Sequence, residues 1–209
     1  MRQIHFAHRL SMPITPKHLP IILASNSPYR QQLLKQLNVV FETANPDIDE
    51  TAKLNEQAEH LVARLAQEKA EAVANTHPAH LIIGSDQVAA MGNTIITKPG
   101  SHSNAVTQLQ QCSGKEITFY TGLALLNSNT DQRQVCVEPF TVHFRQLTTE
   151  AIERYLIAEK PYDCAGSFKV EGLGISLFEK LCGDDPNSLI GLPLIKLTTM
   201  LSIEGVFRP

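Results

Sequence analysis

A short apolar run leads directly into a strong helix start near the beginning of the chain. Residues 19–24 (LPIILA) suit a buried strand, and residues 33–37 (LLKQL) have the spacing of an amphipathic helix. Between them, Ser27 is a favoured N-cap residue, and Pro28 suits the first helical position, whose N–H group has no partner within a helix. This succession predicts a strand, a tight turn and a helix, and so favours a mixed α/β fold.

Arg30 falls in the first turn of that predicted helix, where the helix dipole disfavours a positive charge. A bound anion would remove the conflict. Free N–H groups, the hydroxyls of Ser25 and Ser27 and a guanidinium together suit a phosphate. The alternative is an ordinary helix start whose arginine is solvated.

The bulk properties are those of a soluble globular protein. Its 209 residues can form one domain with one or two lobes, and 43% of them are apolar and 19% charged. The net charge of −3 provides no extended positive field for nucleic acid or an anionic membrane. No apolar run approaches the roughly 20 residues of a membrane span. We therefore expect neither nucleic acid nor membrane as a partner.

The cysteines and histidines lack metal-binding spacing. The four cysteines form no CxxC pair, which indicates reduced thiols and a cytoplasmic protein, and the eight histidines form no HExxH pattern. Residues 1–18 carry three basic residues and no acidic one, but they lack the apolar core and cleavage site of a secretory signal. We expect a flexible extension there, with an uncleaved targeting sequence as the alternative, and a single folded domain over residues 19–209.

The rest of the chain alternates between predicted strands and helices, with no repeat, low-complexity tract or interdomain linker. A tight hairpin is predicted at Gly92-Asn93. Strands are predicted over residues 39–43, 81–84, 117–126, 134–144 and 174–178, and helices over 57–75, 103–114, 149–159 and 189–201. This order predicts an α/β protein with a mixed twisted sheet and flanking helices.

A lysine lies inside the apolar stripe of the clearest predicted helix, residues 57–75. Val62, Leu65 and Val73 share one face of this helix, and Lys69 projects from the middle of that face. A buried ammonium must meet an anion, lose its proton or reach solvent, because an unpaired buried charge is costly. We expect Lys69 to meet an anion; the alternative is that it reaches solvent at the edge of the stripe.

Asp86 follows a fully apolar strand, at a position where α/β proteins place ligand-handling groups. Counting outward from the Gly92-Asn93 hairpin pairs Gln87 with Lys98 on one face of the strand. Asp86 then points to the other face unless a bulge intervenes. A carboxylate and an ammonium emerging together at the end of a sheet would suit a metal-bound phosphate. The alternative is that Asp86 only forms a turn.

An acidic loop over residues 45–51 (NPDIDET) is a further group of charged residues that could take part in a binding site. Asp47, Asp49 and Glu50 could supply oxygen ligands for Mg²⁺ or a similar hard cation, although such a loop can also be merely solvated. The sequence therefore predicts one polyphosphate and metal site that is formed by Arg30, Lys69, Lys98, Asp86 and Glu50.

In their order along the chain, these motifs resemble the Maf family of nucleoside triphosphate pyrophosphatases from about Leu19 onward. The matching segments are 23–28 (LASNSP) with Arg30, 49–51 (DET), 67–70 (QEKA), 84–88 (GSDQV), 98–99 (KP), 120–122 (YTG), 165–168 (AGSF) and 191–194 (GLPL). The resemblance implies an α/β fold like that of inosine triphosphatases, with two lobes around a deep central cleft, often as a homodimer. It also implies hydrolysis between the α- and β-phosphates of a nucleotide with a divalent cation (Mg, Mn or Co).

The same resemblance assigns roles to individual residues. It makes Asp86 catalytic and, together with Glu50, a ligand of the metal. It assigns substrate phosphates to Ser25, Ser27, Arg30, Lys69 and Lys98.

Three residues resemble the subfamily that acts on 7-methyl-GTP. Tyr29 stands where many members carry a second arginine, Gln87 where many carry threonine, and Glu171 accompanies them. Methylation at N7 makes guanine cationic, so an aromatic face should attract it and an arginine repel it, by roughly 0.5–2 kcal/mol. Glu171 could accept the N1 and N2 hydrogens, and Gln87 could read a remaining edge. The alternatives are hydrolysis of dTTP, UTP or other non-canonical nucleotides, and a non-enzymatic role in regulating septum formation.

Overall fold

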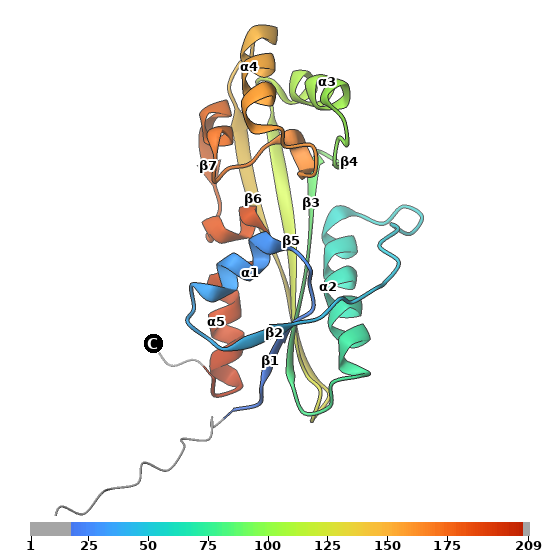
Figure 1. Ribbon diagram of the computed structural model, residues 1–209. Coiled ribbons are helices and arrows are strands. Elements are labelled where there is room, and N and C mark those ends of the chain that lie inside the picture. The colour runs from blue at the N-terminus through green and yellow to red at the C-terminus, as the bar shows by residue number, and fades with distance from the viewer. Residues whose placement is uncertain (1–17, 207–209) are drawn as a thin grey trace, which may run out of the picture.

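Three long antiparallel strands run through both halves of the molecule (Figure 1). The computed structural model describes residues 18–206, so the predicted extension over residues 1–17 lies outside the described residues. The long strands are β3 (Leu81–Met91), β5 (Glu116–Asn127) and β6 (Gln132–Phe144). Their length gives one sheet room for a separate group of helices at each end.

Within residues 18–206, seven strands form one mixed sheet in the order β2-β1-β3-β5-β6-β7, with β4 paired to β3. β1 runs parallel to both β2 and β3, and the other pairings are antiparallel. The short strands are β1 (Ile21–Leu23), β2 (Phe41–Thr43), β4 (Thr94–Ile96) and β7 (Phe178–Cys182). The predicted mixed sheet with flanking helices is confirmed.

Helices cover both faces of the lower half of the sheet in Figure 1. α2 lies on one face, and α1 and α5 lie on the other. Successive side chains of a strand point to opposite faces. Ile82 and Ala124 therefore pack in the cluster beneath α2, whereas Ile83 and Leu125 pack in the cluster beneath α1 and α5. These helices are α1 (Pro28–Lys35), α2 (Ala58–Ala74) and α5 (Leu194–Ile203).

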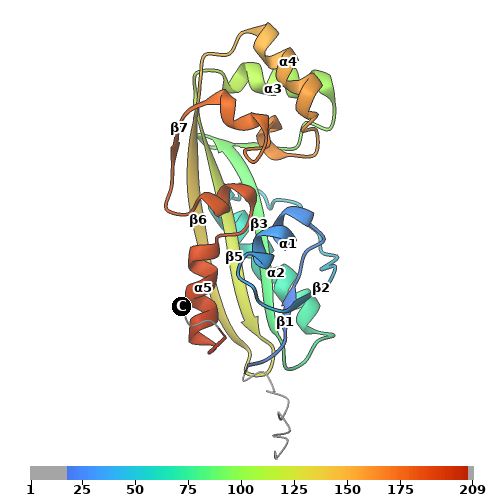
Figure 2. The ribbon, with the colours of Figure 1, turned by 60° about the vertical axis from the view of Figure 1, so that its left-hand side comes forward.

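A second group of helices lies at the other end of the sheet (Figure 2). Its core is built on edge-to-face contacts among Phe119, Phe144, Phe168 and Phe178, with ring centroids 4.7–5.9 Å apart. The elements are α3 (His102–Cys112), α4 (Thr149–Glu159) and the short 3₁₀ helices η1 (Ala165–Ser167) and η2 (Leu173–Leu177). A third short 3₁₀ helix, η3 (Pro186–Ile190), lies between the two groups and contacts α1. None of the helices within residues 18–206 has both the length and the apolar composition to cross a membrane.

Two glycines allow α2 to lie unusually close to the sheet. A Cβ atom on Gly84 would lie 2.0 Å from the carbonyl oxygen of Ala66, and one on Gly122 would lie 2.1 Å from that of Val62. Both contacts are with helix backbone, which cannot turn aside as a side chain can. The two glycines therefore set the distance between α2 and the strands β3 and β5.

Several predicted boundaries are wrong. Of residues 174–178, predicted as a strand, the first four belong to η2, and β7 starts only at Phe178. α3 is capped by Ser101, not by Ser103. The final helix starts at Leu194, because the chain first forms η3 and then passes through a left-handed Gly191 with φ of 118°.

Candidate active site

A cleft of about 640 Å³ opens at one edge of β3, between the two groups of helices. β1 accompanies β3 only as far as Ile83, whose carbonyl oxygen accepts the Ala24 N–H at 2.8 Å. β4 pairs with β3 only from Ala89 onward. Within the described part of the chain, residues 84–88 thus have no strand partner on this edge. Asp86 and Gln87 line the cleft at this gap.

The N-terminus of α1 forms one wall of the cleft. Ser27 caps the helix by accepting the Arg30 N–H at 3.4 Å, and Pro28 occupies the first turn, as predicted. The Arg30 side chain is fixed because its Nε donates to the Gly191 carbonyl at 2.8 Å and its Nη1 to Ser25 Oγ at 3.4 Å. Burial lowers the pKa of Arg30, and the charges of Asp86 and Glu50 partly offset this effect. The guanidinium is therefore held in place next to the two carboxylates.

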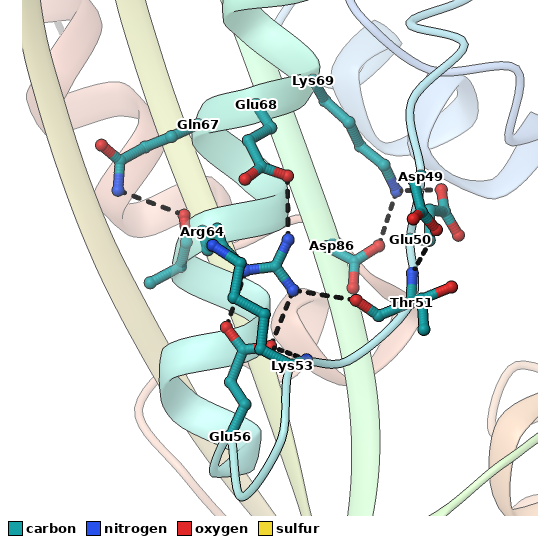
Figure 3. A network of polar contacts seen from close by, with 11 residues as sticks. Asp49, Glu50, Thr51, Lys53, Glu56, Arg64, Gln67, Glu68, Lys69 and Asp86 are labelled. Carbon is teal, nitrogen blue, oxygen red and sulfur yellow. Dashed lines mark hydrogen bonds and ion pairs between the residues drawn. The ribbon is translucent and has the colours of Figure 1, made fainter.

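Lys69 of α2 joins the two carboxylates at the floor of the cleft (Figure 3). Its Nζ lies 2.6 Å from Asp86 Oδ1 and 2.7 Å from Glu50 Oε1. Lys69 is 5% exposed and Asp86 7% exposed, so the predicted buried lysine does meet an anion. Burial raises the pKa of Glu50, but the hydrogen bond and charge of Lys69, together with the charges of Arg30 and Lys98, leave that pKa below its usual value.

Arg64 ties the acidic loop to α2 (Figure 3). Its guanidinium binds Glu56 at 2.7 Å and Glu68 at 2.9 Å, and its Nη2 also donates to the Thr51 carbonyl at 3.2 Å. The hydrogen bonds from Arg64 lower the pKa of Glu56 to about 2, which keeps this carboxylate ionised. The Arg64 network therefore anchors the segment next to Glu50.

β3 presents Asp86 and Gln87 to opposite sides of the sheet, as the alternation predicts. Asp86 faces Lys69 on α2, whereas the amide nitrogen of Gln87 donates to Thr121 Oγ1 at 3.0 Å and to the Ser188 carbonyl at 2.7 Å. The Gln87 amide thereby ties β3 to η3, and its carbonyl oxygen is the group left for a ligand. The predicted pairing of Gln87 with Lys98 is wrong, because β4 ends before Lys98 is reached.

The opposite wall comes from the loops of the other helical group. Glu171 and Lys98 line it, together with three residues that the sequence did not single out: Asp163, Cys164 and Lys169. Burial raises the pKa of the Cys164 thiol to about 12, so this cysteine is not a nucleophile near neutral pH.

Lys169 and Tyr29 meet across the cleft. Burial is the main cause of the raised pKa of Tyr29, and the positive charge of Lys169 partly opposes it. The Tyr29 phenol therefore stays neutral at working pH and leaves an uncharged aromatic ring in the cleft. Lys169 stands in a segment that the sequence identified only as a loop, and no periodic signal marks it.

Two carboxylates fit a hard cation, but the acidic loop does not form a ligand cluster. Asp49 is turned back onto its own loop, where Oδ1 accepts the Thr51 N–H at 2.9 Å. Over residues 18–206, no group of three or more His, Cys, Asp or Glu side chains converges to hold a metal. Glu50 and Asp86 reach the same ammonium, so they could share one cation whose remaining ligands come from substrate and water.

The structure places nine of the ten predicted site residues on the cleft lining: Ser27, Tyr29, Arg30, Glu50, Lys69, Asp86, Gln87, Lys98 and Glu171. Ser25 is the exception. It lies behind the lining, where its Oγ accepts hydrogen bonds from the Ser27 N–H at 3.1 Å and from Arg30. Ser25 therefore shapes the turn that carries the cleft residues.

The overall fold is shared with a protein of known structure. The structure is similar to that of the Staphylococcus aureus Ham1 protein, with a TM-score of 0.51, 14% sequence identity, and coverage of 88% of this chain and 99% of that one. At this identity the likeness shows the fold alone, which is a mixed α/β fold of the Ham1 type.

The sequence then places the chain within that class. The profile of the family described as Maf-like protein matches residues 20–203. A protein named 7-methyl-GTP pyrophosphatase from Pseudomonas fluorescens (strain Pf0-1) is 58% identical, with coverage of 91% of this chain and 100% of the relative. Proteins of the same name are 56% identical in Pseudomonas aeruginosa (90% and 98% covered) and 55% identical in Colwellia psychrerythraea (89% and 93% covered). This chain belongs to the Maf family.

Proposed function

We propose that this protein is a pyrophosphatase that hydrolyses 7-methyl-GTP to 7-methyl-GMP and diphosphate. The observation that carries the proposal is the nearly buried Asp86 carboxylate at the floor of the cleft, bound to Lys69 at 2.6 Å. Arg30 and Lys98 lie in the same cleft. The names of the similar Pseudomonas and Colwellia proteins support this choice of substrate.

Arg30, Lys69 and Lys98 would bind the phosphates of the substrate. Charge builds up on the phosphate oxygens during phosphoryl transfer, and fixed positive groups that meet this charge supply much of the catalysis. Arg30 is already held by the Gly191 carbonyl, so its guanidinium needs little reorganisation on binding. Lys69 can exchange one carboxylate for a phosphate oxygen, and Lys98 reaches the cleft from the exposed side.

Asp86 would take the proton of the water that attacks the α-phosphorus. Glu50 and Asp86 would hold a divalent cation (Mg, Mn or Co), which when bound offsets phosphate charge and polarises the phosphorus–oxygen bonds. The Ser27 hydroxyl and the Tyr29 N–H, in the first turn of α1, would bind phosphate oxygens.

The base would lie against Tyr29, with Glu171 on the facing loop. A neutral aromatic ring attracts a cationic purine, and the Glu171 carboxylate offsets its charge while accepting its N1 and N2 hydrogens. The carbonyl oxygen of Gln87 is able to accept one further hydrogen bond. Unmethylated GTP lacks the positive ring, so it keeps the hydrogen bonds to Glu171 but loses the electrostatic attraction of a cationic ring to Tyr29 and Glu171.

The experiment is diphosphate release from 7-methyl-GTP, GTP, dTTP and UTP with Mg²⁺, Mn²⁺ or Co²⁺ by wild type and Asp86→Asn. We expect wild type to prefer 7-methyl-GTP, and Asp86→Asn to lose at least about a hundredfold in kcat, as loss of a general base does. Asp49→Asn is the matched control, because Asp49 belongs to the acidic loop but does not line the cleft.

Circular dichroism checks that Asp86→Asn remains folded. Near-normal turnover by a folded Asp86→Asn would remove Asp86 from the mechanism. A preference for dTTP or UTP would mean that one of these nucleotides, and not 7-methyl-GTP, is the substrate. No turnover with any of the four nucleotides would favour a regulatory, non-enzymatic protein.

Assembly and location follow as expectations of the same proposal. We expect a homodimer, which light scattering of the purified protein measures as twice the 23.1 kDa of the chain. We expect a cytoplasmic protein, which cell fractionation tests.

A further inference from the structure

The loop over residues 169–174 carries two charged side chains, Lys169 and Glu171, into the cleft. The Lys169 carbonyl closes this loop by accepting the Gly172 N–H at 3.3 Å and the Gly174 N–H at 3.0 Å. A Cβ atom on Gly174 would lie 2.3 Å from that same carbonyl oxygen. The loop is therefore a tight reversal with Glu171 near its tip.

Two side chains of α4 hold the loop, one at each end. Tyr155 Oη accepts the Lys169 N–H at 3.1 Å, and Glu159 Oε2 accepts the Leu173 N–H at 2.8 Å. Tyr155 and Glu159 are four residues apart, so they lie on the same face of α4. One helix face thus fixes both ends of the segment that presents Glu171.

The loop also packs directly on Glu159. A Cβ atom on Gly172 would lie 2.7 Å from Glu159 Oε2, so the loop backbone lies directly against this carboxylate. Tyr155 is 6% exposed, and burial raises its pKa, so its hydroxyl stays neutral. Neither Tyr155 nor Glu159 lines the cleft, so neither touches a bound nucleotide.

We propose that Glu159 and Tyr155 are positioning residues that hold Glu171 and Lys169 in place to select the base of the nucleotide. The inference rests on the proposed function for its substrate, but not for its geometry. A loop that is ordered before binding does not have to be ordered by the ligand, so its contacts contribute fully to affinity. Without either anchor, part of the binding free energy of the nucleotide is used to order the loop, so the affinity falls.

The test compares Glu159→Ala, which removes the acceptor, with Glu159→Gln, which keeps an acceptor oxygen. For Glu159→Ala we expect the KM for 7-methyl-GTP to rise about tenfold, the effect of one hydrogen bond to a charged group. We expect kcat to change little and the preference over GTP to shrink. Glu159→Gln should restore most of the wild-type KM and most of the wild-type preference for 7-methyl-GTP over GTP.

Glu153→Ala is the matched control, because Glu153 lies on the same helix but binds His102 instead of the loop. The double variant Glu159→Ala/Glu171→Ala should show the preference of Glu171→Ala alone, since both changes act through one contact. Unchanged KM and preference in Glu159→Ala would overturn the inference. So would a fall in kcat of equal size for both nucleotides.

Hydrogen exchange of the free protein separates this inference from the proposed function. We expect the amides of Lys169 and Leu173 to exchange faster in Glu159→Ala than in wild type, and unchanged in Glu153→Ala. Protection that is equal in wild type and Glu159→Ala would overturn the positioning role whatever the substrate is. Faster exchange, with no turnover of 7-methyl-GTP by wild type, would support the positioning role and reject the proposed substrate.

Discussion

Lys69 illustrates how a single residue can organise the site. It bridges the buried carboxylate of Asp86 and the exposed carboxylate of Glu50, which would otherwise repel each other. The Glu50 pKa lies below its usual value of 4.5. Ionised Glu50 therefore favours the folded state at pH values above 4.5, and this contribution is lost as the pH falls through the lower folded-state pKa.

Replacement of Lys69 by methionine should raise the pKa of Glu50, because burial then acts without its main counterweight. We expect Lys69→Met to release diphosphate more slowly and to show the acid limb of its kcat/KM profile at higher pH. Profiles of both proteins between pH 4 and pH 8 measure the shift. Lys35→Met, a change on the exposed end of α1, is the control, and superimposable acid limbs would contradict the account.

At the scale of elements, the position of α2 depends on glycines in the strands beneath it. Gly122 faces the Val62 carbonyl so closely that even one methyl group forces helix and strand apart. Such overpacking typically costs about 1–3 kcal/mol. It would also draw Lys69 away from Asp86, because α2 carries Lys69 and β3, next to β5, carries Asp86.

Gly122→Ala should therefore lower both the melting temperature and the rate of diphosphate release. Gly92→Asn is the matched control, since Gly92 faces open space at a φ of +58° that asparagine tolerates. Differential scanning calorimetry and the activity assay measure the two effects. A Gly122→Ala protein with normal stability would show that α2 can move without cost.

Local signals predicted the elements whose causes are local. Ser27 and Pro28 determine the start of α1 through capping and backbone geometry, and helix periodicity placed Lys69 on the buried face of α2. Prediction failed where distant contacts decide. Residues 174–178 alternate like a strand, but the Leu173 N–H bound to Glu159 and the Gly174 backbone packed on Lys169 bend the chain into η2.

The same distinction applies to the cleft. Lys98 was placed by counting along a hairpin, which assumes that pairing continues, but β4 covers only three residues. Lys169 reaches Tyr29 because two segments far apart in sequence meet across the cleft, and no local pattern encodes such a meeting. The motif resemblance, by contrast, selected Glu171 without any geometry, and the structure places it on the cleft lining.

For the whole molecule, the question is whether the two helical groups are one folding unit. β3, β5 and β6 pass through both, so their hydrogen-bonded ladder cannot melt at one end without exposing the core at the other. Chains of this size often unfold in several steps. The shared strands lead us to expect one cooperative transition, as the prediction of a single domain over residues 19–209 requires.

The chain has no tryptophan, so single tryptophans can report each lobe separately. Phe41→Trp places a probe against the core beneath α1 and α5, and Tyr162→Trp places one against the core beneath α3 and α4. We expect the two fluorescence transitions in urea to have the same midpoint and to coincide with the loss of helical signal in circular dichroism. Separate midpoints would mean that the two helical groups unfold independently. The cleft would then lie between two domains.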